Sequence, residues 1–560
     1  MVLKSPFPNL DAPSIDIWNF VFKNPLLSPQ NRVPDDRVVL LDPIGKRELT
    51  FGQVRDLSRT FAYNLQTKLY LRKGECLGVF SPNCLEYVVS VLGGPAMGAY
   101  ISPASVAFSV DELVYQLKNS GAKCLVTHAK VLDTALKAAK ACNLPTKNLI
   151  VIQDPSTSSP RQHGCTEFAS LLTTTAGAQL VQPKFNVKAD LLVLPYSSGT
   201  TGRPKGVRLS HHNVVSNLVS LVGSQNKGEV DVPPSDERMV AVLPFSHIYG
   251  LSALVYAAVL TGKMIVVLAQ FDLVAYLELV QRYRCNIGYV VPPILTAFAK
   301  HPIIDKYDVS SLREVGLMCA AAPLSAQLID AVYKRLRIPV FQAFGMTEAS
   351  PLTHFLPPEK WQEGKGGVGH VAPNVESRIV DEHGNDVAPG EVGEIWVRGP
   401  NIFLGYHNNP EATADCMTSD GFYKTGDIGR VEPSTGIFYI TDRLKELIKY
   451  KGYQVPPAEL EGVLSGNPKV ADVAVVGVWD ESEHTEVPRA FIVLQGGNTP
   501  SKDLESEICN WLEKRVAHYK RLRGGIKFVT EIPKNSSGKI MRRVLRQQIA
   551  AEAPEIKAKM

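Results

Sequence analysis

Residues 191–206 read LLVLPYSSGTTGRPKG, an apolar run followed at once by a loop rich in glycine and hydroxyl groups. The run Leu191–Leu194 predicts a short buried strand that ends at Pro195. The glycines let the backbone turn tightly and bring its N–H groups close to an anion, while the Ser and Thr hydroxyls and Lys205 add donors and a positive charge. The Gly-Lys-[Ser/Thr] order of the Walker loop is absent. The stretch therefore predicts an α/β fold in which a strand leads into a phosphate-binding loop.

Similar short apolar runs precede this loop, and helix-like segments separate them. Cys76–Phe80, Lys123–Thr127 and Leu149–Gln153 each predict a strand, and Leu85–Leu92 predicts a helix. The region Glu391–Val397, which follows a Pro-Gly turn, favours an antiparallel β element. Strands that alternate with helices predict a large α/β domain of several subdomains, to which this β element belongs.

A second domain is predicted to begin near the pair Asp442-Arg443. A chain of 560 residues is too long for one hydrophobic core. After this pair we expect a helix start at Pro457–Leu464, strands at Val470–Val478 and Ala490–Leu494, and a helix from Lys502 to about Val516. The sequence thus predicts a large N-terminal domain over residues 1–442 and a small α+β domain over residues 443–560.

Positive charge is concentrated near the C-terminus. The net charge of the chain is only +5, yet residues 514–546 contain 11 basic residues and one acidic residue, Glu531. Such a stretch predicts contact with a polyanionic ligand, and a solvated basic face is the simpler alternative. Nucleic acid is the least favoured partner, because the stretch has few aromatic residues and no nucleic-acid-binding motif accompanies it.

Cysteine usage and hydropathy exclude several other classes of protein. The nine cysteines include no C-x-x-C pair and are odd in number, which argues against a disulfide framework or a zinc site and fits a reducing compartment. The N-terminus lacks the apolar core of a secretory signal. Two long uncharged segments, Tyr87–Val110 and Met239–Gly262, contain Pro, Gly and Ser, so we expect buried strand–helix pieces rather than transmembrane helices.

Five motifs, in this order along the chain, resemble the acyl-adenylate-forming superfamily of acyl-CoA synthetases, adenylation domains and beetle luciferases. They are Tyr196–Gly206, Phe344–Glu348 (FGMTE), Tyr423–Asp427 (YKTGD), Asp442–Gly452 (DRLKELIKYKG) and Pro533–Lys539 (PKNSSGK). The resemblance covers nearly the whole chain, and the block Lys445–Glu461 is most similar to 4-coumarate–CoA ligase-like enzymes. It implies that the small domain is mobile and turns about a hinge near Lys445.

The resemblance implies that ATP binds along these motifs together with Mg²⁺. Glu348 would hold the metal, to which a hard carboxylate oxygen is suited, and Asp427 and Arg443 would hold the ribose hydroxyls. Lys539 is expected to offset the charge that develops as the substrate carboxylate attacks the α-phosphate. The other implied nucleotide contacts are Ser197, Ser198, Gly199, Thr200, Thr201, Gly202, Lys205, Gln342, Ala343, Phe344, Gly345, Met346, Thr347 and Lys445.

In the small domain, Lys449 and Gln454 resemble residues that lie near the adenylate, and we expect them to be catalytic. Lys449 and Lys451 alternate, so on a single strand they would share one face. The predicted coenzyme A contacts are the turn Lys451, Gly452 and Tyr453 and the basic pair Arg521 and Arg523.

The segment Pro244–Leu251 (PFSHIYGL) resembles the one in which His247 and Tyr249 face the acyl site, although a lone His on an apolar stretch is also typical of a core position. Ser252, Ala321 and Ala343 are the other expected pocket residues. In 4-coumarate ligases a Lys commonly occupies the position of Met318, and a Gly that of Ala343. These departures remove a donor for a phenolic hydroxyl and add a methyl group, so the sequence predicts a more apolar pocket.

Together these features predict a ligase that activates an aromatic or medium-chain carboxylic acid with ATP and transfers the acyl group to coenzyme A. Two alternatives share the adenylation half: a luciferase-type oxygenase, and a stand-alone adenylation enzyme that loads a carrier protein. The chain ends with Ala558, Lys559 and Met560, which resemble a peroxisomal address of the Ser-Lys-Leu type. We therefore expect an import receptor as a partner and the peroxisome as the location, with the cytosol as the alternative.

Overall fold

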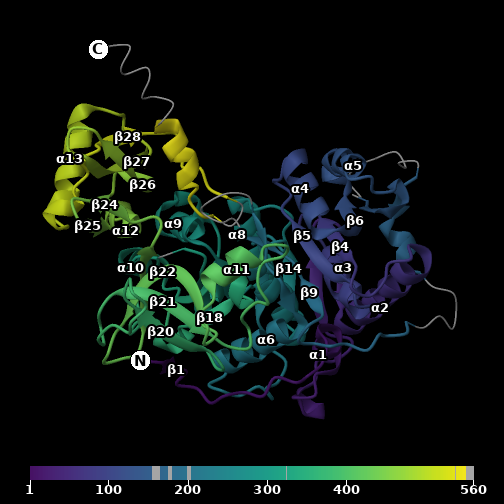
Figure 1. The fold of residues 1–560 in the computed structure, drawn as a ribbon. Coiled ribbons are helices and arrows are strands. Elements are labelled where there is room, and N and C mark those ends of the chain that lie inside the picture. The colour runs from purple at the N-terminus through teal and green to yellow at the C-terminus, as the bar shows by residue number, and fades with distance from the viewer. Residues whose placement is uncertain (154–163, 174–179, 198–203, 323, 536–537, 550–560) are drawn as a thin grey trace.

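The computed structural model describes residues 1–153, 164–173, 180–197, 204–322, 324–535 and 538–549. It has a large N-terminal domain and a smaller C-terminal domain that lies against one side of it (Figure 1). The main core of the large domain extends from Ile17 to Phe438, and the core of the small domain begins at Ile448. The mixed α/β architecture predicted from the sequence is confirmed.

The strand before the phosphate loop belongs to a sheet of seven strands, in the order β12-β9-β5-β4-β6-β7-β8. All neighbours are parallel except β12 and β9. These strands confirm the short apolar runs predicted from the sequence, and β4 and β6 are buried along most of their length, as strands covered on both faces are. The bounds are β4 (Cys76–Phe80), β5 (Tyr100–Ala104), β6 (Ala122–His128), β7 (Leu149–Ile152), β8 (Thr166–Glu167), β9 (Leu191–Val193) and β12 (Leu209–Ser210).

Two further sheets complete the α/β part of the large domain, in the orders β13-β14-β2-β3 and β15-β16-β17-β18-β19. The second sheet carries the FGMTE motif at the end of its central strand β17. The bounds are β2 (Val38–Asp42), β3 (Arg47–Thr50), β13 (Arg238–Ala241), β14 (Met264–Val267), β15 (Ile287–Val290), β16 (Gly316–Cys319), β17 (Val340–Gly345), β18 (Leu352–Phe355) and β19 (His370–Val371).

Helices connect and cover these sheets. Helix α2 begins with a capping box between Thr50 and Gln53, and α4 with one between Ser109 and Glu112, so local sequence fixes where both start. The bounds are α1 (Ile17–Lys23), α2 (Phe51–Lys68), α3 (Leu85–Ala96), α4 (Val110–Ser120), α5 (Leu132–Ala141), α6 (His211–Gln225), α7 (Ala258–Leu260), α8 (Leu273–Tyr283), α9 (Pro292–Lys300), α10 (Ala326–Leu336) and α11 (Pro410–Cys416).

The predicted antiparallel β element is a five-stranded sheet in the order β1-β20-β21-β22-β23. Buried and partly buried residues alternate along β21, as expected where one face packs on the core. The bounds are β1 (Leu3–Lys4), β20 (Glu376–Val380), β21 (Gly393–Arg398), β22 (Tyr423–Val431) and β23 (Phe438–Arg443).

The small domain has the predicted α+β composition. A hairpin of β24 and β25 precedes a three-stranded sheet in the order β26-β27-β28, and α12 and α13 pack on that sheet through Leu460, Leu464, Ile508 and Leu512. A last helix spans residues 542–549. The bounds are β24 (Ile448–Tyr450), β25 (Tyr453–Val455), α12 (Pro457–Ser465), β26 (Val470–Asp480), β27 (Thr485–Leu494), α13 (Lys502–Glu513) and β28 (Ile526–Phe528).

The two long uncharged segments are parts of the core. Tyr87–Val110 forms most of α3 and all of β5, and Met239–Gly262 forms part of β13, a π-helical segment at Gly250–Ala257, and α7. Across the residues that the structure describes, no helix has both the length and the apolar character that a bilayer crossing requires.

Candidate active site

Glu348 lies in a short 3₁₀ turn, Thr347–Ala349, directly after β17. Its side chain is buried, and its Oε1 accepts hydrogen bonds from the Ser197 hydroxyl (3.1 Å) and the Tyr406 hydroxyl (2.9 Å). Ser197 ends β10 (Tyr196–Ser197), which pairs with β11 (Lys205–Gly206) so that Ser197 faces Lys205. The phosphate loop and the second motif therefore meet at the Glu348 carboxylate.

Lys205 closes the other side of this loop, and its ammonium lies 4.8 Å from the centre of the Tyr406 ring. Such a cation–π contact fixes the lysine without neutralising its charge. Five of the predicted nucleotide contacts lie outside the residues that the structure describes: Ser198, Gly199, Thr200, Thr201 and Gly202.

The backbone around Glu348 is held by two buried asparagines that the sequence analysis did not identify. The side-chain amides of Asn217, on α6, and Asn401, after β21, both donate to the carbonyl oxygens of Ala349 and Leu352, at 2.8–3.3 Å. Gly345 precedes this turn, and a Cβ there would lie 2.1 Å from the Pro351 carbonyl oxygen, so only glycine fits. The motif is thus a rigid platform for its carboxylate.

Asp427 and Arg443 are cross-strand neighbours on β22 and β23. The Arg443 Nε donates to Asp427 Oδ1 at 3.0 Å, and the Asp427 side chain is buried. The third motif and the first residues of the hinge motif are therefore adjacent on one sheet. This pair offers carboxylate acceptors and guanidinium donors side by side, the groups that vicinal hydroxyls of a sugar require.

Lys539, from the small domain, reaches the same site. Burial and the nearby Arg443 guanidinium lower the pKa of its ammonium to about 7, against the opposing effects of the Asp427 and Glu348 carboxylates. His247 is affected in turn, since burial and the Lys539 charge lower its pKa to about 4. The structure therefore brings Lys539 together with Glu348, Asp427 and Arg443, and next to the proposed acid site.

The segment that carries Lys539 is fixed to the small domain on both sides. Before it, the Lys534 ammonium pairs with Asp472 on β26 at 2.6 Å; after it, the Arg542 guanidinium makes two hydrogen bonds to Glu461 on α12, at 2.7 and 2.8 Å. Lys520 pairs with Glu459 and Arg546 with Glu446 in the same way. Together with Arg521, which pairs with Glu513, five charges of the basic stretch are thus offset by carboxylates from outside the stretch, which reduces the surface that a polyanion would meet.

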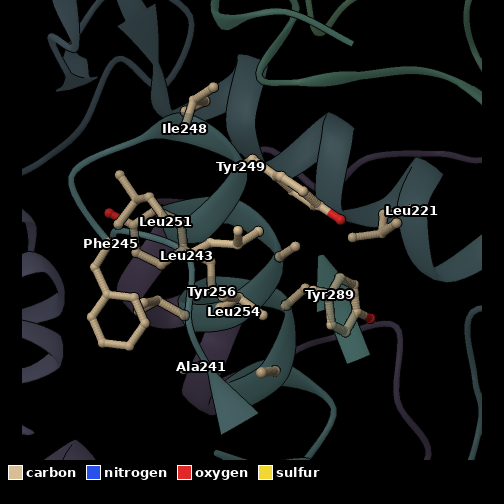
Figure 2. Close-up of a cluster of buried hydrophobic side chains, with 14 of the residues drawn as sticks. Leu221, Ala241, Leu243, Phe245, Ile248, Tyr249, Leu251, Leu254, Tyr256 and Tyr289 are labelled. Atoms are coloured by element: carbon tan, nitrogen blue, oxygen red, sulfur yellow. The ribbon is translucent and has the colours of Figure 1, made fainter. Parts of the chain in front are cut away.

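The predicted acid-pocket residues lie around the π-helical segment and the ends of β16 and β17. The Tyr249 hydroxyl is 3.0 Å from Met318 Sδ and 3.3 Å from the Met318 carbonyl oxygen, and the Tyr249 ring lies edge-on to Tyr289. Figure 2 shows these two tyrosines beside Leu221, at the edge of a large apolar cluster. The Tyr249 hydroxyl therefore donates its proton to Met318, and its oxygen can still accept a hydrogen bond.

Other predicted pocket residues have structural partners as well. Ser252 is buried, and its hydroxyl donates to the Ser350 carbonyl (3.1 Å). Gln342, predicted as a nucleotide contact, is also buried, and its amide donates to the Gly367 carbonyl (2.8 Å). Ala343 pairs with Phe355 across β17 and β18, and Ala321 adopts a positive φ of 81° in the turn after β16. His247 accepts the backbone N–H of Tyr249 through Nδ1 at 3.2 Å.

Four of the five predicted coenzyme A residues lie on or against the β24–β25 hairpin. Lys451 and Gly452 form its two-residue turn with φ values of 45° and 83°, the left-handed conformation that such hairpins require. The Tyr453 ring stacks on Tyr519 at 4.4 Å, and the Arg523 guanidinium lies 4.5 Å from the Tyr450 ring. Arg521 is directed elsewhere, and its guanidinium pairs with Glu513 at 3.4 Å.

One expectation about this hairpin is wrong. Lys449 and Lys451 do not share a strand face, because β24 ends at Tyr450 and Lys451 belongs to the turn. Lys449 instead faces Gln454 across the hairpin, and both are exposed. Among the described residues, no contact joins this pair to Glu348, Asp427 or Lys539. Lys445, the residue expected to act as the hinge, is also exposed.

No group of three or more His, Cys, Asp or Glu residues within the described ranges has the geometry of a metal site. Glu348 supplies the carboxylate that borders the phosphate loop. Both of its described hydrogen bonds are accepted by the same oxygen, Oε1. A cation held by one carboxylate and by substrate phosphates fits this arrangement, as is usual for Mg²⁺. All nine cysteines are free thiols.

Comparison with known proteins agrees with this geometry. The AMP-binding enzyme family matches residues 28–407, and the AMP-binding enzyme C-terminal domain matches residues 459–539. The chain is 36% identical to a probable 4-coumarate–CoA ligase 1 of Dictyostelium discoideum over 97% of each chain. It is 37% identical to 4-coumarate–CoA ligase 1 of Solanum tuberosum over 98% of this chain and 97% of that one.

Among solved structures, the anthranilate CoA ligase AuaEII in complex with anthranoyl-AMP superimposes with a TM-score of 0.84 at 26% identity, covering 97% of this chain and 99% of that one. The family match spans well over half of the chain, and the relatives match it almost end to end. The chain therefore belongs to the AMP-binding enzyme family.

Proposed function

We propose that this protein is an ATP-dependent acid–CoA ligase that forms an acyl-adenylate and then an acyl-CoA thioester. The observation that carries the proposal is the convergence of Lys539, from the small domain, with Glu348, Asp427 and Arg443, from the large one. One cation from a separate domain, placed among the nucleotide-binding motifs, can stabilise a transition state and then be withdrawn.

In the first half-reaction a carboxylate oxygen of the substrate attacks the α-phosphorus of ATP, and pyrophosphate leaves. Asp427 and Arg443 hold the ribose, the phosphate loop and Lys205 hold the β- and γ-phosphates, and Lys539 offsets the charge on the α-phosphate and the incoming carboxylate. When Mg²⁺ accompanies ATP, Glu348 is the residue that would bind it, and the ion would draw charge from the phosphate oxygens.

In the second half-reaction the coenzyme A sulfur attacks the adenylate carbonyl carbon, and AMP leaves. We propose that the small domain first turns near Lys445, which withdraws Lys539 and brings Lys449 and Gln454 toward the adenylate. The hairpin turn Lys451–Gly452 and the Tyr453 ring would then lie along the thiol's path. The stacked aromatic rings and Arg523 suit the adenine and phosphates of coenzyme A.

The acid is proposed to be aromatic or medium-chain, without a hydroxyl at its far end. Two observations support this: Met318 is buried and offers no hydrogen-bond donor, and Ala343, which adds a methyl group where 4-coumarate ligases commonly have Gly, is buried as well. A buried phenol of the substrate would lack the lysine donor that 4-coumarate ligases commonly have at the position of Met318, at a cost of about 1–3 kcal/mol. This sets the chain apart from a ligase that selects 4-coumarate, the acid in the names of several relatives.

We also propose a peroxisomal location, read from the final tripeptide Ala558, Lys559 and Met560. These residues lie outside the described part of the chain, so the proposal depends on the sequence alone. A receptor-read address of this type needs only a free, exposed C-terminus.

The test of the function is a pyrophosphate-release assay over aromatic and C6–C18 acids, with and without coenzyme A, in which thioester, AMP and light are measured as products. Thioester formation that depends on free coenzyme A supports the ligase; light from luciferin, or transfer only to a carrier protein, would replace it with one of the alternatives. Lys539→Ala should lower adenylation by about 10²–10³, yet still convert supplied acyl-adenylate to thioester. Equal losses in both half-reactions of a folded variant would contradict the assignment of Lys539.

A further inference from the structure

Helix α9 of the large domain contacts the small domain at both of its ends. At the start, a Cβ on Gly538 would lie 3.1 Å from Val291, the residue before the helix, so the backbone next to Lys539 approaches this end closely. At the other end lies Lys300, the last residue of the helix. Figure 1 shows α9 on the side of the large domain that faces the small one.

Lys300 extends from the large domain to two backbone carbonyls of the small domain. Its ammonium donates to the Ser465 oxygen at 2.9 Å and to the Val470 oxygen at 2.8 Å. Ser465 is the last residue of α12, and Val470 is the first residue of β26. The last carbonyls of a helix have no partner within it and form the negative end of its dipole, so a cation is favoured there.

Lys300 is not required to terminate its own helix. Arg335, on α10, donates to the carbonyl oxygens of Phe298 and His301 at 3.2 and 3.0 Å and so caps the end of α9. Burial lowers the pKa of Lys300, with Asp472 opposing the shift, which means that the ammonium is partly desolvated where the domains meet. The described contacts of its ammonium are therefore directed across the interface.

The contact is also linked to the catalytic lysine. Asp472, whose charge acts on Lys300, is the partner of Lys534 at the base of the segment that carries Lys539. The ammonium of Lys300 and that of Lys534, which anchors the segment, thus both bind residues of β26. When α12 and β26 are held by Lys300, Lys539 is directed at the nucleotide site.

We propose that Lys300 is a positioning residue that latches the small domain in the orientation required for adenylation, and so sets the balance between the two half-reactions. This inference rests on the proposed function. A turn of the small domain about Lys445 would separate Lys300 from both carbonyls, so the latch would favour one orientation only. Its loss should slow adenylation and leave thioester formation unchanged or faster.

The test compares Lys300→Met, which keeps the apolar stem and removes the donors, with Lys334→Met at an exposed position of α10 as the matched control. We expect Lys300→Met to lower acid-dependent pyrophosphate release by about tenfold, and Lys334→Met to have no effect. Conversion of supplied acyl-adenylate and coenzyme A to thioester should not fall in either variant. Lys300→Arg, which keeps the charge and can reach carbonyl oxygens, should restore part of the adenylation rate.

Hydrogen exchange in the ligand-free protein separates this inference from the proposed function. Lys300→Met should raise exchange in residues 457–473, 533–535 and 538–541 of the small domain, with the core strands β4 and β6 of the large domain unchanged. Unaltered exchange at the interface, or an equal loss of both half-reactions, would overturn the latch whatever the protein's reaction is. If Lys300→Met showed faster exchange while the wild-type protein had no activity on any acid, the latch would be retained and the ligase function rejected.

Discussion

The adenylation step should lose rate as the pH rises through about 7, because the folded protein holds Lys539 at that pKa. The sign follows from the charge. Below the pKa the side chain is an ammonium that can offset negative charge on the α-phosphate, and above it the amine is neutral. At pH 8 about one tenth of the docked lysine would be protonated, so kcat/KM for ATP should be about tenfold below its value at pH 6.

The variant that tests this pH dependence is Lys539→Arg. A guanidinium stays charged over this whole range, so the variant should have a lower maximal rate, owing to its different shape, but no loss of rate between pH 6 and 8. The assay is single-turnover formation of acyl-AMP at sub-saturating ATP, from pH 6 to 9, at constant ionic strength. Thioester formation from supplied acyl-adenylate serves as the control, since the proposed mechanism withdraws Lys539 in that step.

Two results would refute this reasoning. A flat profile in the wild type would mean that Lys539 remains charged at the site or does not act there. The same decline in Lys539→Arg would assign the pH dependence to another group. His247 is not a candidate for a decline near pH 7, because its pKa is lowered to about 4.

Two further predictions depend on contacts described above, and a third depends on the C-terminal sequence alone. Arg523→Ala should raise the KM for coenzyme A about fivefold at low salt and leave that for ATP unchanged, whereas Arg521→Ala, whose guanidinium pairs with Glu513, should have a smaller effect; steady-state kinetics at two salt concentrations would check both. Met318→Lys should increase the ratio of kcat/KM for 4-coumarate to that for cinnamate by about tenfold, with Met318→Leu as the control of similar volume, and an unchanged ratio would remove Met318 from the acid site. Removal of the last three residues should convert punctate, peroxisomal fluorescence of an N-terminal fusion into diffuse fluorescence, and diffuse fluorescence of the intact fusion would place the enzyme in the cytosol.

Much of the fold could be predicted from the sequence, because short apolar runs bounded by turn residues mark buried strands. The bounds of β4 agree with the prediction at both ends, and those of α12 and β26 differ by one or two residues at one end. The turn predicted at Lys451, Gly452 and Tyr453 is also found, as the two-residue hairpin turn Lys451–Gly452. The shared face expected for Lys449 and Lys451 on a single strand is wrong, because Gly452 permits a tight turn and Lys451 shares its left-handed conformation.

The candidate site could be predicted only where a motif marks it. Glu348, Asp427 and Lys539 stand in recognisable local sequences, whereas Tyr406 and Asn401 act on Glu348 and its turn from a loop with no such signal. The roles of Tyr406 and Asn401 depend on which carboxylate or carbonyl oxygen the folded chain places at 2.8–2.9 Å from their side chains. The sequence likewise does not show which charges of the basic stretch have partners. In the folded chain Lys520, Lys534, Arg542 and Arg546 pair with acidic residues, so less of the excess charge is available to a ligand.

The ion pairs on either side of Lys539 have a mechanical consequence. Because Lys534 is tied to β26 and Arg542 to α12, the ends of the lysine segment cannot swing out independently of the domain core. Under the proposed turn about Lys445, the Lys539 amine would move only together with the whole domain. The proposal therefore makes the rotation of the domain the event that sets when the amine enters and leaves the nucleotide site.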